Sequence, residues 1–434
     1  MTVYQADWLC PASSDPLAGG AIAVENGRIV DVGLLPPAAD TVRFPGCAII
    51  PGFVNAHAHL ELTILRGFLE DVDFFKWIRA VTVLKQQKLT VDDMRTSARL
   101  GVIEALAAGV TCVGEVMDAG VSWPAMIEYG LQGVAYQEVF GPSDAQADDA
   151  FKGLVAKVDS MRSLETPAQR LGVSPHAPFT VSPRLFRMVK DYARKQNLAV
   201  TVHVAESAEE DRFVRRGEGP FADRHRQRGF AVTAEDCSPI AYLDRCGVLD
   251  RDTLLIHAIR LDDGDFAILR RTGASVVHCP KSNAKLGHGI ARLLELRDGG
   301  VRLSLGTDSV ASNNVVDMFE EMRAAVFMQR ARLGSFAALG ATAAFRMATL
   351  GGAECLGLEA HLGSLEKDKR ADFVVVDLSE PAMQPVFDPV QSMVYSACRR
   401  NVRATYLAGE AVKLDSAPVV EDIRGIAARL GLQG

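Results

Sequence analysis

Three histidines and one aspartate are the residues of this sequence best suited to hold a metal ion. His57 and His59 stand two positions apart, so on a β-strand both imidazoles would point to the same face. His203 and Asp308 each end an apolar run much further along the chain. Imidazole and carboxylate together suit a zinc-like divalent ion. The set predicts a site for one metal ion with a coordination position left open for water.

Each of these residues is uninformative alone, because HxH pairs are common and a lone histidine at a strand end is usually part of a hydrogen-bonded structure. Their joint occurrence at the ends of apolar runs favours the metal site.

Glu206 and His257 could supply the acid–base chemistry that hydrolysis at such a metal requires. Glu206 follows His203 by three positions, where its carboxylate could move protons without binding the metal. The alternative is that Glu206 caps a helix, since Ser207 and the acidic pair after it resemble a helix start. His257 ends another apolar run and could hold the attacking water or stabilise the developing negative charge. Asp308 could both bind the metal and accept a proton from that water.

Eight apolar runs separated by helical patterns would bring these residues together. Continuous apolar character is typical of parallel strands covered on both faces. The runs are 52–59, 110–116, 133–140, 170–178, 199–206, 253–260, 274–280 and 301–308. Eight such units predict an α/β fold, a (β/α)₈ barrel, in which the carboxyl ends of the strands meet at one mouth.

Short strand-like runs at both chain ends predict a second, accessory domain. Residues 22–24 lead through Asn26-Gly27 into 28–32, which is a strong hairpin signal, and similar runs return at 372–377 and 402–407. We therefore expect an accessory β domain from residues 1–51 and 362–434, and a catalytic barrel over 52–361.

The composition is that of an ordinary globular protein of 434 residues, 48% of them hydrophobic. A formal net charge of -7 without a long Lys or Arg run argues against nucleic acid as a partner and favours a small molecule. The eight cysteines include no CxxC pair. No segment is apolar enough to span a membrane and no signal peptide is evident, so we expect a cytoplasmic protein, and a homo-oligomer is left open.

Five sequence blocks together resemble the amidohydrolase superfamily, within it the aminohydrolases that deaminate purine-like or triazine-like rings. The blocks are PGFVNAHAH at 51–59, VHVAE at 202–206, LIH at 255–257, HCPKSNAKL at 278–286 and LGTDSVASNN at 305–314. The resemblance implies a barrel with an accessory β-sandwich and a single Zn²⁺, or Fe²⁺ in some members, bound by His57, His59, His203 and Asp308. It also implies that Glu206 passes a proton to a ring nitrogen and that His257 orients the water, so that ammonia leaves.

The resemblance implies an adenine-containing, nucleoside-like substrate. Blocks 282–286 and 312–314 resemble S-adenosylhomocysteine and methylthioadenosine deaminases, but those enzymes have a glutamate where Phe75 stands, two residues before Trp77. Residues 59–62, 174–179 and the long stretch after Glu206 are more similar to the aminodeoxyfutalosine deaminase-like branch. We therefore expect aminodeoxyfutalosine as the substrate, with other purine or pyrimidine deamination and triazine hydrolysis as alternatives. A barrel that only binds is a remote alternative, against which the intact ligand set argues.

Several polar and aromatic residues are candidates for contacting that substrate. Arginines in the stretch after Glu206 could form a basic lid for a carboxylate, although a solvated helix face explains most of them. These arginines are Arg212, Arg215, Arg216, Arg224, Arg226 and Arg228. The other expected substrate contacts are Trp77, Arg79, His176 and Asn283.

Overall fold

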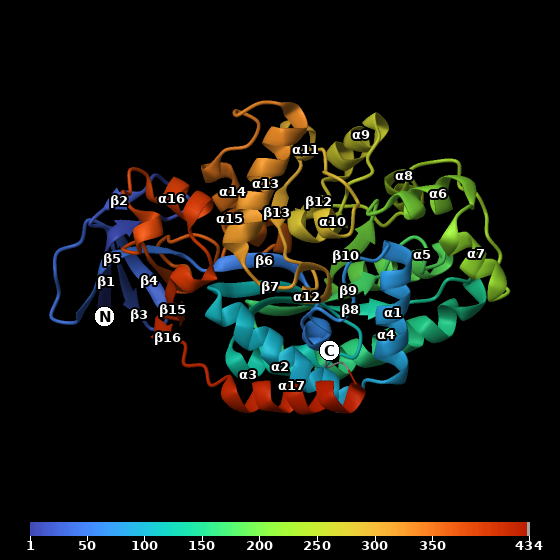
Figure 1. Cartoon of the computed structure of the whole chain (residues 1–434), viewed down its shortest axis with the longest axis horizontal. Helices are drawn as coiled ribbons and strands as arrows, with labels where there is room; N and C mark the ends of the chain where they lie inside the picture. Colours follow the sequence, from blue (N-terminus) through green and yellow to red (C-terminus); the bar gives the residue numbers. More distant parts are fainter. Residues whose placement is uncertain (432–434) are drawn as a thin grey trace.

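A barrel of eight parallel strands forms the larger part of the molecule (Figure 1). The computed structural model describes residues 1–431. Neighbouring barrel strands pair in chain order, and a parallel bridge between Ala58 and Asp308 joins the first strand to the end of the last. The strands are β6 (Phe53–Ala58), β7 (Val110–Met117), β8 (Gln132–Val139), β9 (Gln169–Pro175), β10 (Ala199–Val204), β11 (Thr253–His257), β12 (Ser275–His278) and β13 (Leu303–Leu305).

Each of the eight predicted apolar runs coincides with one barrel strand, so the expected barrel is confirmed. Every residue of β6, β7 and β8 is buried, as expected for strands covered by helices outside and by side chains within. The helices around and between these strands are α1 (Phe74–Gln87), α2 (Val91–Ala107), α3 (Ser122–Tyr129), α4 (Ala147–Met161), α5 (Pro183–Gln196), α6 (Ala208–Arg216), α7 (Pro220–Gln227), α8 (Pro239–Arg245), α9 (Asp263–Thr272), α10 (Pro280–Lys285), α11 (Leu293–Asp298), α12 (Val310–Asn313), α13 (Met318–Leu333), α14 (Ala341–Met347) and α15 (Leu350–Leu356).

A second, mixed sheet is built from both chain ends and lies beside the barrel, at the left of Figure 1. Its strands are β1 (Thr2–Leu9), β2 (Leu17–Ala18), β3 (Ala21–Glu25), β4 (Arg28–Gly33), β5 (Thr41–Pro51), β14 (Phe373–Asp377), β15 (Val402–Leu407) and β16 (Glu410–Ala411). Asn26 and Gly27 have positive φ angles of 50° and 75°, which suits the tight hairpin expected between β3 and β4. The expected accessory domain from both termini is confirmed; its exact boundaries stay a prediction.

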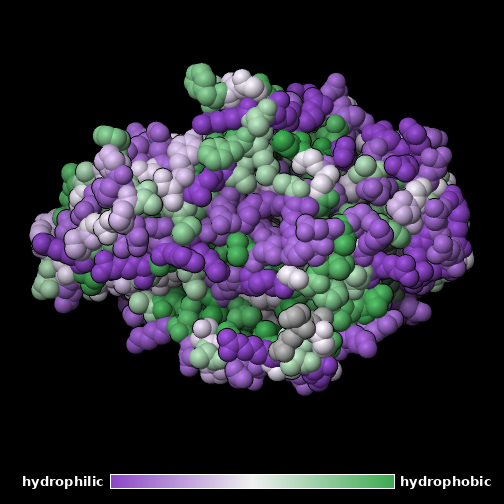
Figure 2. All heavy atoms as spheres, viewed as in Figure 1, coloured by the Kyte–Doolittle hydropathy of each residue, from purple (hydrophilic) through white to green (hydrophobic). Residues whose placement is uncertain are grey.

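The last helix, α17 (Ala417–Leu430), packs on the barrel and not on the accessory sheet. Its Ile423 and Ile426 lie among apolar residues of the barrel side, and Arg429 pairs with Asp93 of α2. Figure 2 shows a largely hydrophilic face on which hydrophobic residues gather over α2 and α3, next to α17. The shorter α16 (Pro389–Ser396) instead packs against α13 and α14.

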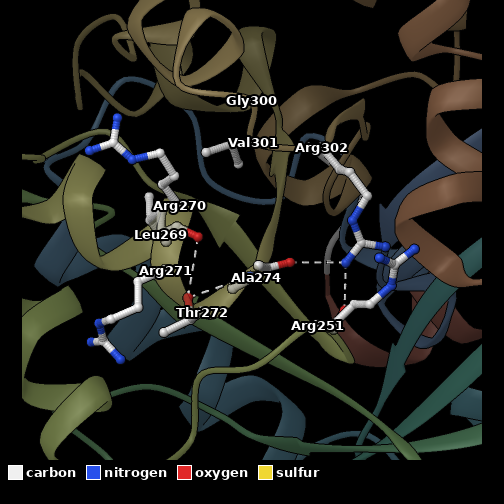
Figure 3. Close-up of a pocket in the computed structure, with 10 residues that line it drawn as sticks. Arg251, Leu269, Arg270, Arg271, Thr272, Ala274, Gly300, Val301 and Arg302 are labelled. Atoms are coloured by element: carbon white, nitrogen blue, oxygen red, sulfur yellow. Dashed lines mark hydrogen bonds between the residues drawn. The ribbon is translucent and has the colours of Figure 1, made fainter.

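The two ends of the barrel carry different chemistry. A hollow of about 350 Å³ lies at the amino ends of β11, β12 and β13 and is lined by Arg251, Arg270, Arg271 and Arg302 (Figure 3). In that view the side chains of Arg270 and Arg271 point away from Arg251 and Arg302. The residues expected to bind the metal lie at the carboxyl ends. Within residues 1–431, no helix has both the length and the apolar character that a membrane span requires.

Candidate active site

A cavity of about 660 Å³ opens at the carboxyl ends of the barrel strands. Active sites of (β/α)₈ barrels lie at this end. His59, His203, Glu206, His257 and Asp308 all line it. The structure therefore brings together, in one cavity, residues that are some 250 positions apart in the sequence.

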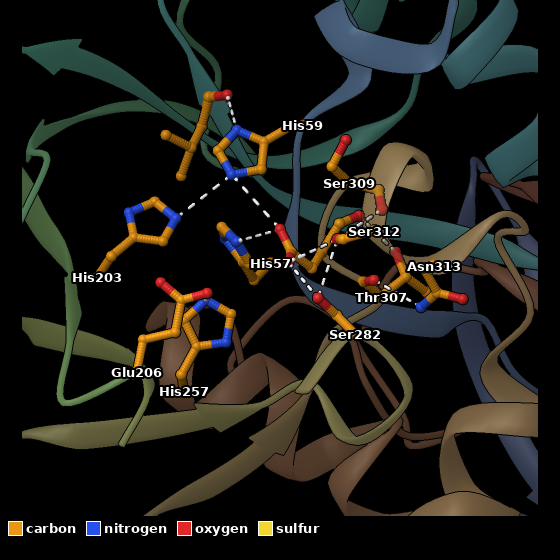
Figure 4. A network of polar contacts seen from close by, with 12 residues as sticks. His57, His59, His203, Glu206, His257, Ser282, Thr307, Ser309, Ser312 and Asn313 are labelled. Atoms are coloured by element: carbon orange, nitrogen blue, oxygen red, sulfur yellow. Dashed lines mark hydrogen bonds and ion pairs between the residues drawn. The ribbon is translucent and has the colours of Figure 1, made fainter. Parts of the chain in front are cut away.

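The four predicted metal ligands form a compact cluster, of which Figure 4 labels the three histidines. His57 Nε2 lies 3.2 Å from Asp308 Oδ1, and His59 Nε2 lies 3.6 Å from the same oxygen. His59 Nε2 also lies 3.3 Å from His203 Nε2. Two sets, His57–His59–Asp308 and His57–His203–His257, each place one potential ligand atom per residue within 4.8 Å of the others. The two sets share His57, so His257 lies close to the cluster as well.

The protonation states of this cluster fit a bound cation. Burial lowers the pKa of His57 and His203, and it lowers the pKa of His59 to about 3, so these rings are neutral at pH 7. Burial acts against ionisation of Asp308, but its hydrogen bond with His57 holds the pKa well below the ordinary value. Three neutral imidazoles and one carboxylate are a donor set for a divalent ion, and the Nε2 atoms of His59 and His203 face each other in the cluster. The residues present therefore fit the metal expected from the sequence.

Hydrogen bonds behind the cluster orient its members. Ser282 and Ser312 donate to Asp308 Oδ2 over 2.6 and 3.0 Å, which leaves Oδ1 facing the histidines. His59 Nδ1 lies 3.1 Å from the carbonyl of Val116, so its Nε2 is directed into the cluster. Such outer hydrogen bonds fix the tautomer and direction of metal ligands.

Close backbone packing brings His57 to the last strand. A Cβ atom on Gly306 would lie only 2.9 Å from both the backbone nitrogen and Cβ of His57. A side chain at position 306 would therefore force the two strands apart.

Glu206 is held by its backbone while its side chain faces the cavity. The carboxylate of Glu210 accepts hydrogen bonds from the amides of Ala205 and Glu206 over 2.9 and 2.8 Å. The hydroxyl of Ser207 caps α6 by accepting from the Glu210 amide. Because Ser207 is the capping residue, the Glu206 carboxylate is free for other contacts.

Two histidines contact the Glu206 carboxylate. Glu206 Oε1 lies 3.5 Å from His257 Nε2 and 3.3 Å from His288 Nε2. Burial raises the pKa of Glu206, but these two histidines more than compensate and keep it below the ordinary value. The carboxylate is thus ionised at neutral pH and ready to accept a proton.

The four residues expected to contact the substrate do not all line the cavity. Trp77 and His176 line the cavity. Asn283 is buried, and its Oδ1 lies 2.9 Å from His257 Nδ1, so it supports His257 from outside the cavity. Arg79 is exposed on α1 and does not line the cavity.

Of the six arginines in the stretch after Glu206, Arg228 alone lines the cavity. Arg215 is paired with Asp211 and Asp262, and Arg226 is paired with Asp223. The remaining three, Arg212, Arg216 and Arg224, are exposed. Five of the six arginines therefore match the solvated-face alternative.

Sequence reasoning missed His288 and Lys85. His288 follows α10 in a Gly-His-Gly turn, away from any strand end, and only the fold brings it to Glu206. Lys85 lines the cavity from the last turn of α1. Lys85 follows Val81 by four residues and Trp77 by eight, so all three lie on one face of the helix. This spacing is the sequence signal from which Lys85 could have been predicted.

Comparison with known proteins matches the chain to one family model and to full-length relatives. The model of the amidohydrolase family matches residues 48–412. A 5-methylthioadenosine/S-adenosylhomocysteine deaminase from Halobacterium salinarum is 34% identical over 412 residues, covering 92% of this chain and 89% of the relative. A protein of the same name from Haloarcula marismortui is 32% identical, covering 99% of this chain and 93% of the relative.

Solved structures show the same fold. An adenosine deaminase from Xanthomonas campestris with bound zinc is 30% identical and superposes with a TM-score of 0.88, covering 100% of this chain and 99% of the other. An atrazine chlorohydrolase from Arthrobacter aurescens complexed with zinc is 20% identical (TM-score 0.84, covering 98% and 100%). The aminofutalosine deaminase of Helicobacter pylori is 21% identical (TM-score 0.81, covering 95% and 100%). The last two likenesses show the fold alone.

Proposed function

This chain belongs to the amidohydrolase family and is a deaminase of that family, and on that premise we propose that it hydrolyses the 6-amino group of a 5′-substituted adenine nucleoside, releasing ammonia. The observation that carries the proposal is the placement of Glu206. Its ionised carboxylate lies in the cavity beside the metal-binding cluster and against two histidines. A deaminase needs such a group, because the leaving nitrogen must be protonated.

His57, His59, His203 and Asp308 would hold the metal, for which Zn²⁺, present in structural relatives, is the first candidate. A divalent ion held there supplies an activated water at neutral pH. Glu206 accepts the proton of the attacking water and delivers it to the ring nitrogen next to the amine-bearing carbon. It then assists the departure of the amino group in the same way.

His257 adds a polar contact on the same side of the cavity. Its Nδ1 lies 2.9 Å from Asn283 Oδ1, which fixes the ring with Nε2 facing Glu206 and the site. From this position His257 orients the attacking water for the reaction. Asn283 thus acts as a positioning residue.

A 5′-thioether such as that of 5′-methylthioadenosine or S-adenosylhomocysteine is the first candidate for the substituent. Relatives at 32–34% identity bear the name of that activity, and Phe74, Trp77, Ile78 and Val81 of α1 give the cavity an apolar wall suited to a thioether. Aminodeoxyfutalosine is the second candidate. Arg228 favours it, since a guanidinium at the cavity can pair with the carboxylate of that nucleoside.

The test is ammonia release from the zinc-loaded enzyme with adenosine, 5′-methylthioadenosine, S-adenosylhomocysteine, aminodeoxyfutalosine, guanine and an amino-triazine. We expect release from adenine nucleosides. Glu206→Gln should keep its metal content and lose about 10²- to 10⁴-fold in kcat, because the proton carrier is gone. Glu209→Gln, on α6 but away from the cavity, is the matched control and should keep wild-type rates. Full activity of Glu206→Gln would contradict the proton-carrier role.

A further inference from the structure

Asn55 is a buried amide of the first barrel strand to which the proposed reaction assigns no task. It lies two residues before His57 on β6, with 1% of its surface exposed. Its Oδ1 accepts a hydrogen bond from the backbone amide of Thr307 over 2.9 Å, and its Nδ2 donates to the hydroxyl of Thr307 over 2.7 Å. Because Thr307 directly precedes Asp308, the side chain of Asn55 ties together the chain segments that carry two of the expected metal ligands.

A side chain replaces backbone pairing at the point where the barrel closes. β6 and β13 stand at the two ends of the sheet order, and a bridge between Ala58 and Asp308 joins the first strand to the end of the last. In this bridge the amide of Asp308 donates to the carbonyl of His57 over 2.9 Å. The amide of Thr307, one residue earlier, has Asn55 Oδ1 as its acceptor in place of a backbone carbonyl. Asn55 therefore extends the closure of the barrel next to the metal cluster.

The backbone of Asp308 is in a sparsely populated conformation that depends on its surroundings. Its φ is 59°, in the left-handed region that a residue with a side chain occupies at a cost in free energy unless its neighbours hold it there. Asn55 holds the amide and the hydroxyl of Thr307, while Asn313 Nδ2 donates to the carbonyl of Thr307 over 2.6 Å. These contacts fix the residue before Asp308, and with it the direction in which the Asp308 carboxylate leaves the backbone.

The separation of the two ligands suits a shared ion. His57 Nε2 lies 3.2 Å from Asp308 Oδ1, and two ligands of a tetrahedral zinc ion, with bonds of about 2.0–2.1 Å, lie about 3.3 Å apart. A shift of Thr307 relative to Asn55 would change this separation. We propose that Asn55 is a positioning residue that, through Thr307, sets the distance between the side chains of His57 and Asp308 and thereby the metal affinity of the site. This inference rests on the proposed function, of which the metal site is a part.

The experiment measures Zn²⁺ affinity, by competition with a chelator, in the wild type and in variants of Asn55 and Thr307. We expect Asn55→Ala to bind Zn²⁺ about 10- to 100-fold more weakly, as is typical when a residue that holds a metal ligand in place is removed. Thr307→Val keeps the shape of the side chain but loses the hydroxyl, so its affinity should fall about 5- to 10-fold, the contribution of one hydrogen bond. Thr307→Ser keeps the hydroxyl and should bind Zn²⁺ as the wild type does. The absorption spectrum of the Co²⁺-loaded protein, which reports coordination geometry, should change in Asn55→Ala and Thr307→Val but not in Thr307→Ser.

A matched control separates positioning from stability. Gln169 is a buried amide at the amino end of β9, opposite the metal cluster, and its Nε2 donates to the carbonyls of Met126 and Leu131 over 3.3 and 3.1 Å. Gln169→Ala should lower the thermal unfolding temperature of the metal-free protein but leave Zn²⁺ affinity unchanged.

The outcomes separate this inference from the proposed function. An equal loss of Zn²⁺ affinity in Gln169→Ala and Asn55→Ala would overturn the role of Asn55, and so would unchanged affinity in both Asn55→Ala and Thr307→Val. If Asn55→Ala does not fold, equal affinity of Thr307→Val and Thr307→Ser overturns the role, and a weaker Thr307→Val supports it. Absence of ammonia release from every adenine nucleoside would overturn the proposed function alone, because the affinity measurements do not depend on turnover.

Discussion

Replacing His288 with asparagine should move the acidic limb of the pH–rate profile to higher pH. His288 Nε2 lies 3.3 Å from Glu206 Oε1, and its ring packs edge-on against Phe74 with a centroid distance of 4.5 Å. After His257, the close contact with His288 is the next cause that keeps the pKa of Glu206 low despite its burial. Without the contact with His288, the effect of burial on the carboxylate is compensated less, so the pKa of Glu206 rises.

The size of the shift follows from the geometry. Two unit charges 3.3 Å apart attract by about 5 kcal/mol at an effective dielectric constant near 20, which is an upper limit for this pair. His257 remains beside Glu206 in the variant and retains part of the effect. We therefore expect the acidic limb to move to higher pH by only part of this limit, where about 1.4 kcal/mol corresponds to one pH unit.

The direction of the effect on activity is set by the role of Glu206. The ionised carboxylate accepts the proton of the attacking water, so activity falls as pH drops through the pKa of Glu206. A higher pKa moves this fall to higher pH, and the rates of variant and wild type converge on the alkaline side. The assay is kcat/KM for ammonia release between about pH 4.5 and 9, a range that brackets the ordinary carboxyl and imidazole pKa values. His361→Gln, outside the cavity, is the control. An acidic limb that stays in place in His288→Asn would refute the reasoning.

Two further predictions concern the metal cluster. His203→Ala should purify with little bound metal and keep its circular dichroism spectrum, since His203 is a proposed ligand whose Nδ1 has no protein partner; full metal content by mass spectrometry would contradict its role. The double variant Ser282→Ala/Ser312→Ala removes both hydroxyls that hold Asp308 Oδ2 and should weaken metal affinity about 10- to 100-fold, measured by competition with a chelator. Unchanged affinity would show that the two serines do not position Asp308.

Local sequence signals predicted the barrel because its strands are buried on both faces. Their apolar runs needed no knowledge of the partner strand, and polar residues at the run ends marked the mouth where His57, His203 and Asp308 meet. Contacts between residues that only tertiary packing brings together could not be predicted from local sequence patterns. His288 lies outside the strand pattern, and only the return of the chain after α10 brings it to Glu206.

Arg79 and helix α17 lie in surroundings that differ from those expected from the sequence. Arg79 lies on the outward face of α1, whereas Trp77 faces the cavity, because residues two apart on a helix point in different directions. Residues 362–434 were expected to belong to the accessory domain, yet α17 within this range packs on α2, because the sequence of a helix does not show which element covers its buried face.

The bridge between Ala58 and Asp308 makes the metal cluster part of the closure of the barrel. β13 has three residues, and the amide of Asp308 donates to the carbonyl of His57 over 2.9 Å at the seam where the last strand meets the first. An ion bound by the side chains of His57 and Asp308 would join the ends of a loop of some 250 residues, as a covalent cross-link would. Losing the ion would then loosen this seam before the rest of the barrel, so the metal would set the kinetic lifetime of the fold as well as its activity.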